Sequence, residues 1–324
     1  MPAPKTKVEP QFSTRASFYD KFNDLKCRFD AMEPEVAETV RDPAMGIEGY
    51  VVVWNTGISH KGKLKGCGKG GTRIMPTVTL DDVKRLARSM ALKNAAAGLP
   101  LGGAKAALKA DPKAPGFEKA YRRFVQLCKP HLFEFGGKYG GFGFDIGAEP
   151  VHALWACDEL KTTKSFTGKP VEMGGTDYDR EGIAGLGVAV AGRTALELAG
   201  KKPSAVTFAV QGLGAMGAAV FRYFSEYGGH LRFLADPVYG GTWAFANDPS
   251  PALREALVKR DTATARTLIE KEAKKISADT QDILYQDIDI LFPCAIQDVI
   301  TAANQSKIKA RFISEGAKNP TSIE

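Results

Sequence analysis

Residues 205–217 read AVTFAVQGLGAMG, and they set the architecture of the second half of this chain. The first six are mostly apolar, with β-branched and aromatic side chains, and they predict a strand over residues 205–210. Gly212, Gly214 and Gly217 then form a GxGxxG spacing that opens a predicted helix. Glycines in this spacing permit a tight strand-to-helix turn and let a pyrophosphate approach the helix N-terminus closely.

An acidic residue completes this pattern. A second strand is predicted over residues 231–235, and it runs into Asp236, about 20 positions beyond the glycines. A carboxylate at that place can accept a hydrogen bond from an adenosine ribose and would repel a 2′-phosphate. We therefore predict a dinucleotide site that takes NAD in preference to NADP. The other elements expected in this half are helices over residues 182–198 and 251–275 and strands over residues 288–295 and 310–314.

The composition is that of an ordinary globular protein. Hydrophobic residues make up 44% and charged residues 25% of the chain, which excludes the intrinsically disordered class. At 324 residues the chain is long for a single core, so two domains are expected. The net charge of +7 suits anionic small molecules, and because the basic residues are scattered, nucleic-acid binding is disfavoured.

Cysteine usage and the pattern of apolar stretches indicate a cytoplasmic protein that does not cross a membrane. The five cysteines are far apart and form no CxxC pair, which argues against a disulfide framework or a structural metal site. The N-terminal residues lack the apolar core of a signal peptide. The most apolar stretch, residues 182–200, is interrupted by Arg193 and Glu197. Residues 1–15 are predicted to form a loose tail.

The first half is also predicted to contain helices and strands. Its expected elements are helices over residues 18–32 and 117–132, a strand over residues 49–55, and a helix that begins after Thr79. Thr79 and Asp82 have the spacing of a capping box. An apolar stripe at helical spacing follows, and Lys93 lies three residues past its member Met90. The Lys93 side chain is therefore expected to point inward.

Two glycine pairs stand beside lysines in this half. Gly70 and Gly71 follow Lys69, and a predicted turn at residues 102–103 presents Lys105. Glycine pairs let a backbone come close to a ligand. A lone lysine beside such a turn is commonly a solvated surface charge. Three lysines on or beside one predicted helix, namely Lys69, Lys93 and Lys105, favour a pocket for an anionic substrate. Mutual repulsion and partial desolvation would favour a neutral Lys105, which could act as a general base.

The loop over residues 136–147 is rich in glycine and aromatic residues and carries Asp145. A carboxylate in such a loop has two interpretations. It makes local hydrogen bonds in a turn, or it is held in the wall of a pocket near Lys105. The residues alone leave both open.

Taken together, these segments resemble the Glu/Leu/Phe/Val amino-acid dehydrogenase family from about residue 50 to the end of the chain. The matching motifs are KGGTR at 69–73, KNAAAGLP at 93–100, GGAK at 102–105, Asp145 with Gly147, TGKP at 167–170, Gly174 with Gly175, the GxGxxG, PCA at 293–295 and EGA at 315–317. The resemblance implies an α/β substrate-binding and oligomerisation domain over residues 1–181. A Rossmann-like, doubly wound dinucleotide-binding domain over residues 182–324 would follow, and the protein would be a homo-oligomer built through its first domain.

The resemblance implies oxidative deamination of an L-amino acid, with hydride passing from Cα to nicotinamide. By motif position, Lys93 would bind the substrate α-carboxylate, Lys105 would activate the water that attacks the imino carbon, and Asp145 would carry protons to and from nitrogen. Lys69, at the head of the first glycine pair, occupies the position where glutamate enzymes bind the side-chain carboxylate and leucine enzymes keep an apolar residue. A buried ammonium there would discriminate by charge, which favours L-glutamate. The run after Lys93 and residues 210–212 resemble the leucine branch, so a leucine, branched-chain or phenylalanine dehydrogenase is the alternative.

Departures from the family pattern bear on this expectation. Ala106–Ala107 replace two glycines, and Ala184 stands where a threonine is common. Lys318 precedes Asn319, which is the expected contact to the cofactor ribose. The chain ends at Glu324, where the family normally continues with a segment that adds a second contact to the substrate side chain. A third possibility is therefore a non-catalytic homologue that binds a nucleotide.

Overall fold

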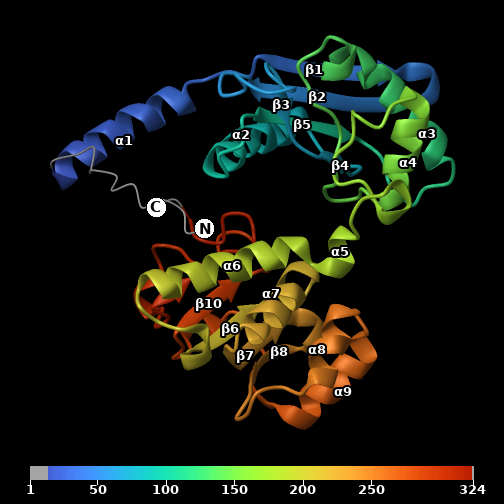
Figure 1. Cartoon of the computed structure of the whole chain (residues 1–324). Helices are drawn as coiled ribbons and strands as arrows, with labels where there is room; N and C mark the ends of the chain where they lie inside the picture. The colour runs from blue at the N-terminus through green and yellow to red at the C-terminus, as the bar shows by residue number, and fades with distance from the viewer. Residues whose placement is uncertain (1–13, 323–324) are drawn as a thin grey trace. The chain divides into compact units, whose positions relative to one another are not determined.

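The computed structural model describes residues 14–322, and the chain divides into two compact units, Met1–Gly175 and Thr176–Glu324 (Figure 1). The predicted two-domain α/β fold is confirmed. The boundary expected from the sequence lies after residue 181, whereas the short helix α5 (Tyr178–Glu181) groups with the second unit. Most of the tail predicted over residues 1–15 lies outside the described residues. Among the described helices, none combines the length and the hydrophobicity that a membrane span requires.

The first unit is built on a mixed, five-stranded sheet. Its strands are β1 (Val36–Asp42), β2 (Ile47–Asn55), β3 (Gly68–Lys69), β4 (Thr72–Ile74) and β5 (Gly102–Leu108), and its helices are α1 (Arg15–Asp30), α2 (Leu80–Ala96), α3 (Phe117–Cys128) and α4 (Pro150–Leu160). The strand order is β1-β2-β5-β3, with β4 also paired to β5. β2 is antiparallel to β1 and β5, whereas β3 and β4 are parallel to β5.

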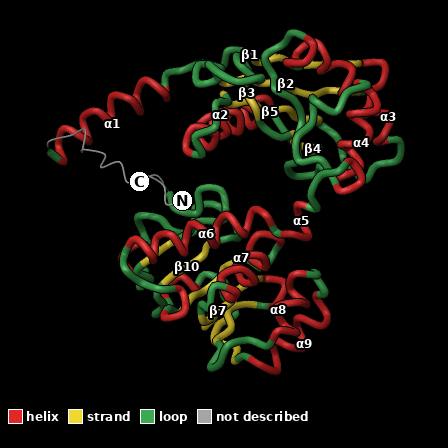
Figure 2. The backbone as a smooth tube through the Cα atoms, in the orientation of Figure 1, coloured by secondary structure: helices red, strands yellow, loops and turns green. Residues whose placement is uncertain are grey.

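Alternation along β2 explains why both faces of this sheet are covered. Tyr50, Val52 and Trp54 pack in one cluster with α2, and the intervening Val51 and Val53 pack in another with α3 and α4. Figure 2 traces the backbone of these helices and of the strands. The helix predicted over residues 18–32 is α1, but none of its side chains is buried. The capping box predicted at the start of α2 is present.

The stretch expected to be a glycine turn before Lys105 is instead the buried strand β5. An added Cβ on Gly103 would lie 2.4 Å from two backbone atoms of α2. One on Gly102 would lie 1.8 Å from the carbonyl oxygen of Asn55. Real Cβ atoms do not approach so closely, so this glycine pair serves the packing of α2 and β2 on β5. The prediction of a turn at residues 102–103 is therefore wrong.

The second unit is a six-stranded sheet. Its strands are β6 (Thr207–Gln211), β7 (His230–Asp236), β8 (Gly241–Ala244), β9 (Lys274–Ser277), β10 (Ile290–Pro293) and β11 (Phe312–Ile313), and its helices besides α5 are α6 (Ile183–Leu198), α7 (Ala215–Glu226), α8 (Pro251–Val258) and α9 (Thr262–Glu272). The order is β11-β10-β6-β7-β8-β9. The first four strands are parallel, and β8 and β9 extend the sheet antiparallel. This arrangement confirms the Rossmann-like expectation.

Helices cover one face of the second sheet. Side chains of α6, α7, α8 and α9 form one core with Phe208, Val210 and Phe292. The residues between them on the strands face the other way and pack against the 3₁₀ turn Asp282–Tyr285 and residues 299–310. The backbone on this second face is therefore a short turn and irregular chain, and the face carries no α-helix within residues 14–322. The helices expected on both faces of a doubly wound sheet thus lie on one face within these residues.

Candidate functional site

Lys105 and Asp145 form a nearly buried ion pair in the first unit. Lys105 Nζ lies 3.0 Å from Asp145 Oδ2, and the two side chains are 5% and 12% exposed. Lys105 projects from β5, and Asp145 comes from the predicted glycine-rich loop. The structure thus brings these two candidate residues together. An adjacent carboxylate favours the protonated ammonium, so the contact does not favour the neutral Lys105 expected from the sequence.

Lys69 is enclosed by main-chain carbonyl groups. Its Nζ donates hydrogen bonds to the carbonyl oxygens of Gly70 (3.0 Å), Gly141 (2.6 Å) and Phe142 (2.9 Å). These three contacts match the three donors of an ammonium. Burial, with the positive charges of Lys105 and Lys169 nearby, lowers the pKa of Lys69 to about 7. The surroundings of Lys69 therefore shift its protonation equilibrium toward the neutral amine.

The glycine pair after Lys69 allows neighbouring backbones to pack. An added Cβ on Gly70 would lie 1.7 Å from the carbonyl oxygen of Ala104 on β5. One on Gly71 would lie 2.4 Å from the carbonyl oxygen of Phe144, next to Asp145. Both glycines therefore bring the lysine-bearing segment against the strand and the loop that carry the ion pair. Their sequence-predicted contact with a substrate stays a prediction.

Lys93 does not point into the core as expected from its spacing to Met90. The buried residues of α2 are Val83, Ala87, Ala91 and Asn94, and Lys93 is exposed. The inward prediction is wrong because the buried face passes through the residue after the lysine. Asn94 was not among the residues predicted from the sequence, and its Nδ2 donates to the carbonyl oxygens of Lys69 (3.2 Å) and Gly102 (2.8 Å). The sequence signal that could have found Asn94 is its helical spacing from Ala87 and Ala91, which places its amide on their side of the helix.

Of the three glycines of the GxGxxG, Gly212 and Gly214 lie between β6 and α7, and Gly217 lies in the first turn of α7. Gly212 has φ +83°, and an added Cβ on Gly217 would lie 1.7 Å from the Gly212 carbonyl oxygen, so both are needed for the close turn. Gly214 is the N-cap of α7 and offers no side chain to the first helical N–H groups. An added Cβ there meets nothing within 4 Å. The helix N-terminus thus keeps space and donors that fit a dinucleotide phosphate.

The chain segments that follow the parallel strands β6, β10 and β11 meet beside the glycine loop. The N–H of Cys294 donates to the Gln211 carbonyl oxygen at 2.8 Å, and the N–H groups of Gly316 and Ala317 donate to that of Pro293 at 3.1 and 3.0 Å. β7 and β10 flank β6 on opposite sides, so the chain changes winding direction here. Ligands of open α/β sheets bind at such a switch point.

Asp236 and Asn319 were the other residues expected to contact the cofactor. Both oxygens of Asp236 accept backbone hydrogen bonds, Oδ2 from the N–H of Leu213 at 2.6 Å and Oδ1 from that of Val238 at 2.8 Å. A carboxylate has about four acceptor sites, so these bonds leave capacity for a ribose hydroxyl. Asn319 is exposed, with φ +48°, on the loop after β11.

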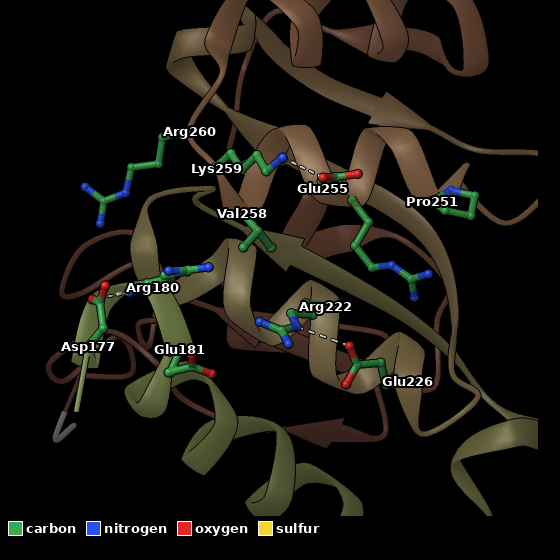
Figure 3. Close-up of a pocket in the computed structure, with 11 residues that line it drawn as sticks. Asp177, Arg180, Glu181, Arg222, Glu226, Pro251, Glu255, Val258, Lys259 and Arg260 are labelled. Atoms are coloured by element: carbon green, nitrogen blue, oxygen red, sulfur yellow. Dashed lines mark hydrogen bonds and ion pairs between the residues drawn. The ribbon is translucent and has the colours of Figure 1, made fainter. Parts of the chain in front are cut away.

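A separate cavity of about 750 Å³ lies among α5, α7 and α8 (Figure 3). Charged side chains line most of it, and some are already paired within it: Arg222 with Glu226 at 3.1 Å and Lys259 with Glu255 at 2.6 Å. The lining takes Arg222 and Glu226 from the C-terminal part of α7 and includes none of the three loop glycines. This cavity is therefore separate from the glycine loop at the start of α7.

Two family models match the chain. Residues 34–160 match "Glu/Leu/Phe/Val dehydrogenase, dimerisation domain", and residues 174–324 match "Glutamate/Leucine/Phenylalanine/Valine dehydrogenase". The chain is 37% identical to a glutamate dehydrogenase of Aeropyrum pernix, over 78% of this chain and 60% of that protein. It is 33% identical to an NADP(+)-dependent glutamate dehydrogenase of Pyrobaculum calidifontis, over 85% of this chain and 64% of that protein. The chain therefore spans less than two thirds of the length of either relative.

The fold also matches a solved structure. The chain aligns with glutamate dehydrogenase 2 of Plasmodium falciparum with a TM-score of 0.74, over 95% of this chain and 72% of that one. The two sequences are 23% identical, so this likeness speaks for the fold alone.

Proposed function

Because this chain belongs to the Glu/Leu/Phe/Val dehydrogenase family, we propose that it catalyses the reversible oxidative deamination of an L-amino acid with a nicotinamide dinucleotide. The observation that carries the proposal is the buried Lys105–Asp145 pair, with Nζ and Oδ2 at 3.0 Å. The reaction needs a base and a proton carrier within hydrogen-bond reach of each other. A dinucleotide held at the open N-terminus of α7 would supply the acceptor for the hydride that leaves the substrate Cα.

Three side chains of the first unit take the proposed roles. The exposed ammonium of Lys93 binds the substrate α-carboxylate. Asp145 Oδ2 can accept the ammonium proton of Lys105, and this transfer leaves a neutral amine that takes a proton from water as the water attacks the imino carbon. The protonated Asp145 can then deliver its proton to the departing nitrogen. The ion pair is thus the resting form of the acid–base couple.

L-Glutamate and 2-oxoglutarate are the proposed substrates, and Lys69 is the side chain that supports this choice. A pKa of about 7 means that both forms of Lys69 are populated near neutral pH, and a substrate carboxylate would favour the charged one. The three carbonyl contacts of Lys69 support a second candidate, a branched-chain or aromatic amino-acid dehydrogenase. To bind a carboxylate, the ammonium has to exchange one of these contacts.

The test is to incubate the purified protein with NADH and ammonium plus either 2-oxoglutarate or 2-oxoisocaproate and to follow NADH absorbance. Oxidation with 2-oxoglutarate is expected. Oxidation with 2-oxoisocaproate alone would favour the second candidate, and none with either would refute the proposed activity. Lys69→Leu should lower kcat/KM for 2-oxoglutarate by about 100-fold or more, since the carboxylate loses its partner. Lys164→Leu is the control, because it removes an exposed lysine paired with Glu134.

We further propose NAD as the preferred cofactor, since the Asp236 carboxylate at the end of β7 would repel a 2′-phosphate. The relative from Pyrobaculum calidifontis is by name NADP(+)-dependent, so the choice needs its own measurement. NADH and NADPH oxidation compared in the same assay would settle it, and a higher kcat/KM with NADPH would contradict the proposal. A homo-oligomer built through the first unit is proposed as well, to be tested by light scattering.

A further inference from the structure

Arg73 contacts the same carboxylate oxygen as Lys105. Its Nε lies 3.0 Å from Asp145 Oδ2, and Lys105 Nζ lies at the same distance from that atom. The Arg73 side chain is 15% exposed, so the three charged groups are largely withdrawn from water. Charge-assisted hydrogen bonds of this kind are the strong ones, and water screens them less when they are buried.

The strand register places Arg73 there. Arg73 on β4 is paired with Ala107 on β5, two residues beyond Lys105. Paired residues of a parallel ladder, and every second residue along a strand, project from the same face of the sheet. Arg73 and Lys105 therefore project from one face on neighbouring strands, and the two cations reach a common partner.

The backbone of β4 also holds the loop that carries Asp145. The N–H of Thr72, before Arg73, donates to the Gly143 carbonyl oxygen at 2.8 Å. The N–H of Ile74, after Arg73, donates to the Ile146 carbonyl oxygen at 2.9 Å. Two backbone hydrogen bonds, one on each side of Arg73, therefore hold the loop on each side of Asp145. The Arg73 guanidinium adds a side-chain contact between them.

We propose that Arg73 is a positioning residue that keeps Asp145 aligned and ionised for proton exchange with Lys105. The inference rests on the proposed dehydrogenase activity. Lys105 has to lose its proton during the cycle, whereas a guanidinium stays charged at every working pH. Because its charge favours the ionised carboxylate, Arg73 stabilises the resting ion pair and favours release of the proton from protonated Asp145 to the departing nitrogen.

The first test compares steady-state kinetics of Arg73→Met, Arg73→Lys and the wild type. Arg73→Met is expected to lower kcat by about 10- to 100-fold while KM for the 2-oxo acid changes far less, because the loss falls on proton transfer. Arg73→Lys should recover part of that loss. Arg123→Met is the matched control, since it removes an Arg Nε–carboxylate contact to Asp42 of 2.7 Å elsewhere in the same unit. Equal kcat in Arg73→Met and wild type would overturn the inference.

A pH profile separates positioning from a general loss of structure. Arg73 and Lys105 both contact Asp145, and the charges of Lys105 and Lys169 in turn act on Lys69. Removing Arg73 weakens the preference for the ionised carboxylate, so the acidic limb of the kcat profile should move up by about one pH unit. Arg123→Met should leave the limb in place. An unmoved limb in Arg73→Met would count against the inference.

Amide hydrogen exchange tests the same point without activity. In Arg73→Met the amides of residues 143–147 are expected to exchange about tenfold faster than in Arg123→Met, because the loop has lost its side-chain anchor. Equal exchange in the two variants would overturn the positioning role. If the wild type turned over no amino acid, the proposed function would fail, and this comparison would still decide the role of Arg73 in holding the loop.

Discussion

The backbone N–H of Leu213 donates to Oδ2 of Asp236 at 2.6 Å. Leu213 lies within the GxGxxG loop after β6, and Asp236 ends the neighbouring strand β7. The second oxygen of Asp236 accepts from the N–H of Val238 at 2.8 Å, so one carboxylate ties the glycine loop to the turn that follows β7. Asp236 therefore shapes the dinucleotide loop itself, in addition to any contact it makes with a ribose.

Replacing this carboxylate should loosen the loop. A hydrogen bond to an ionised group contributes about 1.5–3 kcal/mol, and in Asp236→Asn at least one of the two N–H donors faces a weaker or absent acceptor. We expect the Kd for NADH to rise at least about tenfold. Fluorescence titration with NADH measures it, and Asp287→Asn, at an exposed aspartate of the same unit, is the control. An unchanged Kd in Asp236→Asn would contradict this role.

The buried amine of Lys69 should give stability a defined pH dependence. Its pKa of about 7 in the folded protein compares with about 10.4 in an unfolded chain. Between these values the unfolded chain binds more protons at this site, so the contribution of Lys69 to the free energy of unfolding increases with pH. Below pH 7 both states are protonated and the contribution is constant.

We therefore expect the difference in unfolding free energy between wild type and Lys69→Met to change in favour of the wild type as the pH rises from about 7 to 10. The slope is at most about 1.4 kcal/mol per pH unit. Chemical denaturation at several pH values measures it. A difference that stays flat across this window would show that Lys69 is not neutralised by folding.

Gly103 on β5 should not accept a side chain. An added Cβ lies 2.4 Å from backbone atoms of α2, so Gly103→Ala has to push the helix away from the sheet and should cost about 1–3 kcal/mol of unfolding free energy. Gly57→Ala is the control, since an added Cβ there meets nothing within 4 Å. Thermal denaturation compares the two variants. Equal melting temperatures would mean that α2 does not pack this closely.

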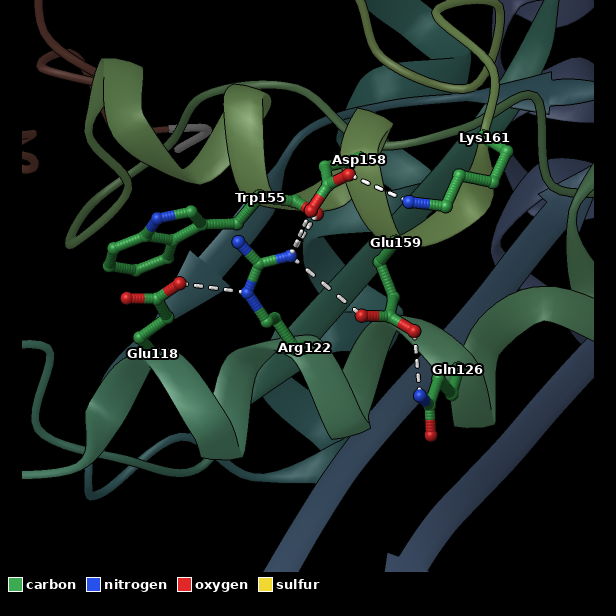
Figure 4. Close-up of polar contacts among 7 residues, drawn as sticks. All are labelled: Glu118, Arg122, Gln126, Trp155, Asp158, Glu159 and Lys161. Atoms are coloured by element: carbon green, nitrogen blue, oxygen red, sulfur yellow. Dashed lines mark hydrogen bonds and ion pairs between the residues drawn. The ribbon is translucent and has the colours of Figure 1, made fainter.

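Arg122 links α3 to α4 through a network of carboxylates (Figure 4). Its Nε lies 2.8 Å from Glu118, and its Nη1 lies 2.8 Å from Asp158 and 3.8 Å from Glu159. Arg122→Met should destabilise the first unit by about 1 kcal/mol, and the effect should shrink as salt is added. Lys21→Met, which removes an exposed pair with Asp24, should have no measurable effect. Denaturant titrations at low and high salt measure both effects. A loss in Arg122→Met that does not change with salt, or a measurable loss in Lys21→Met, would contradict these expectations.

Features with a local physical cause were predictable from the sequence. The capping box of Thr79 and Asp82, the glycine turn from Gly212 to Gly217 and the loop that carries Asp145 all formed where expected. Each depends on residues a few positions apart, because capping and left-handed backbone conformations are set by neighbours in the chain. The central strand β5 was not predictable in this way. Its Gly-Gly-Ala run is typical of a turn, and it forms a strand because α2 packs against it.

Contacts between distant segments could not be predicted in the same way. Arg73 and Asp145 are 72 positions apart, and their contact depends on the parallel pairing of β4 with β5 and on the loop that lies along β4. The exposure of Lys93 and the burial of Asn94 depend on which side of α2 faces the sheet. Periodicity alone predicted that Lys93 would be on the buried side, whereas the next residue, Asn94, is buried.

By itself, the amino-acid sequence determined the family, the two α/β units and most of the candidate site residues, because motif spacing and hydrophobic period are properties of the linear chain. Only the tertiary structure decided the partners of those residues: carbonyl groups around Lys69, two cations on Asp145, and a glycine loop held by Asp236. The physical reason is that burial and charge pairing depend on distances in space, which arise when separate strands and loops pack together.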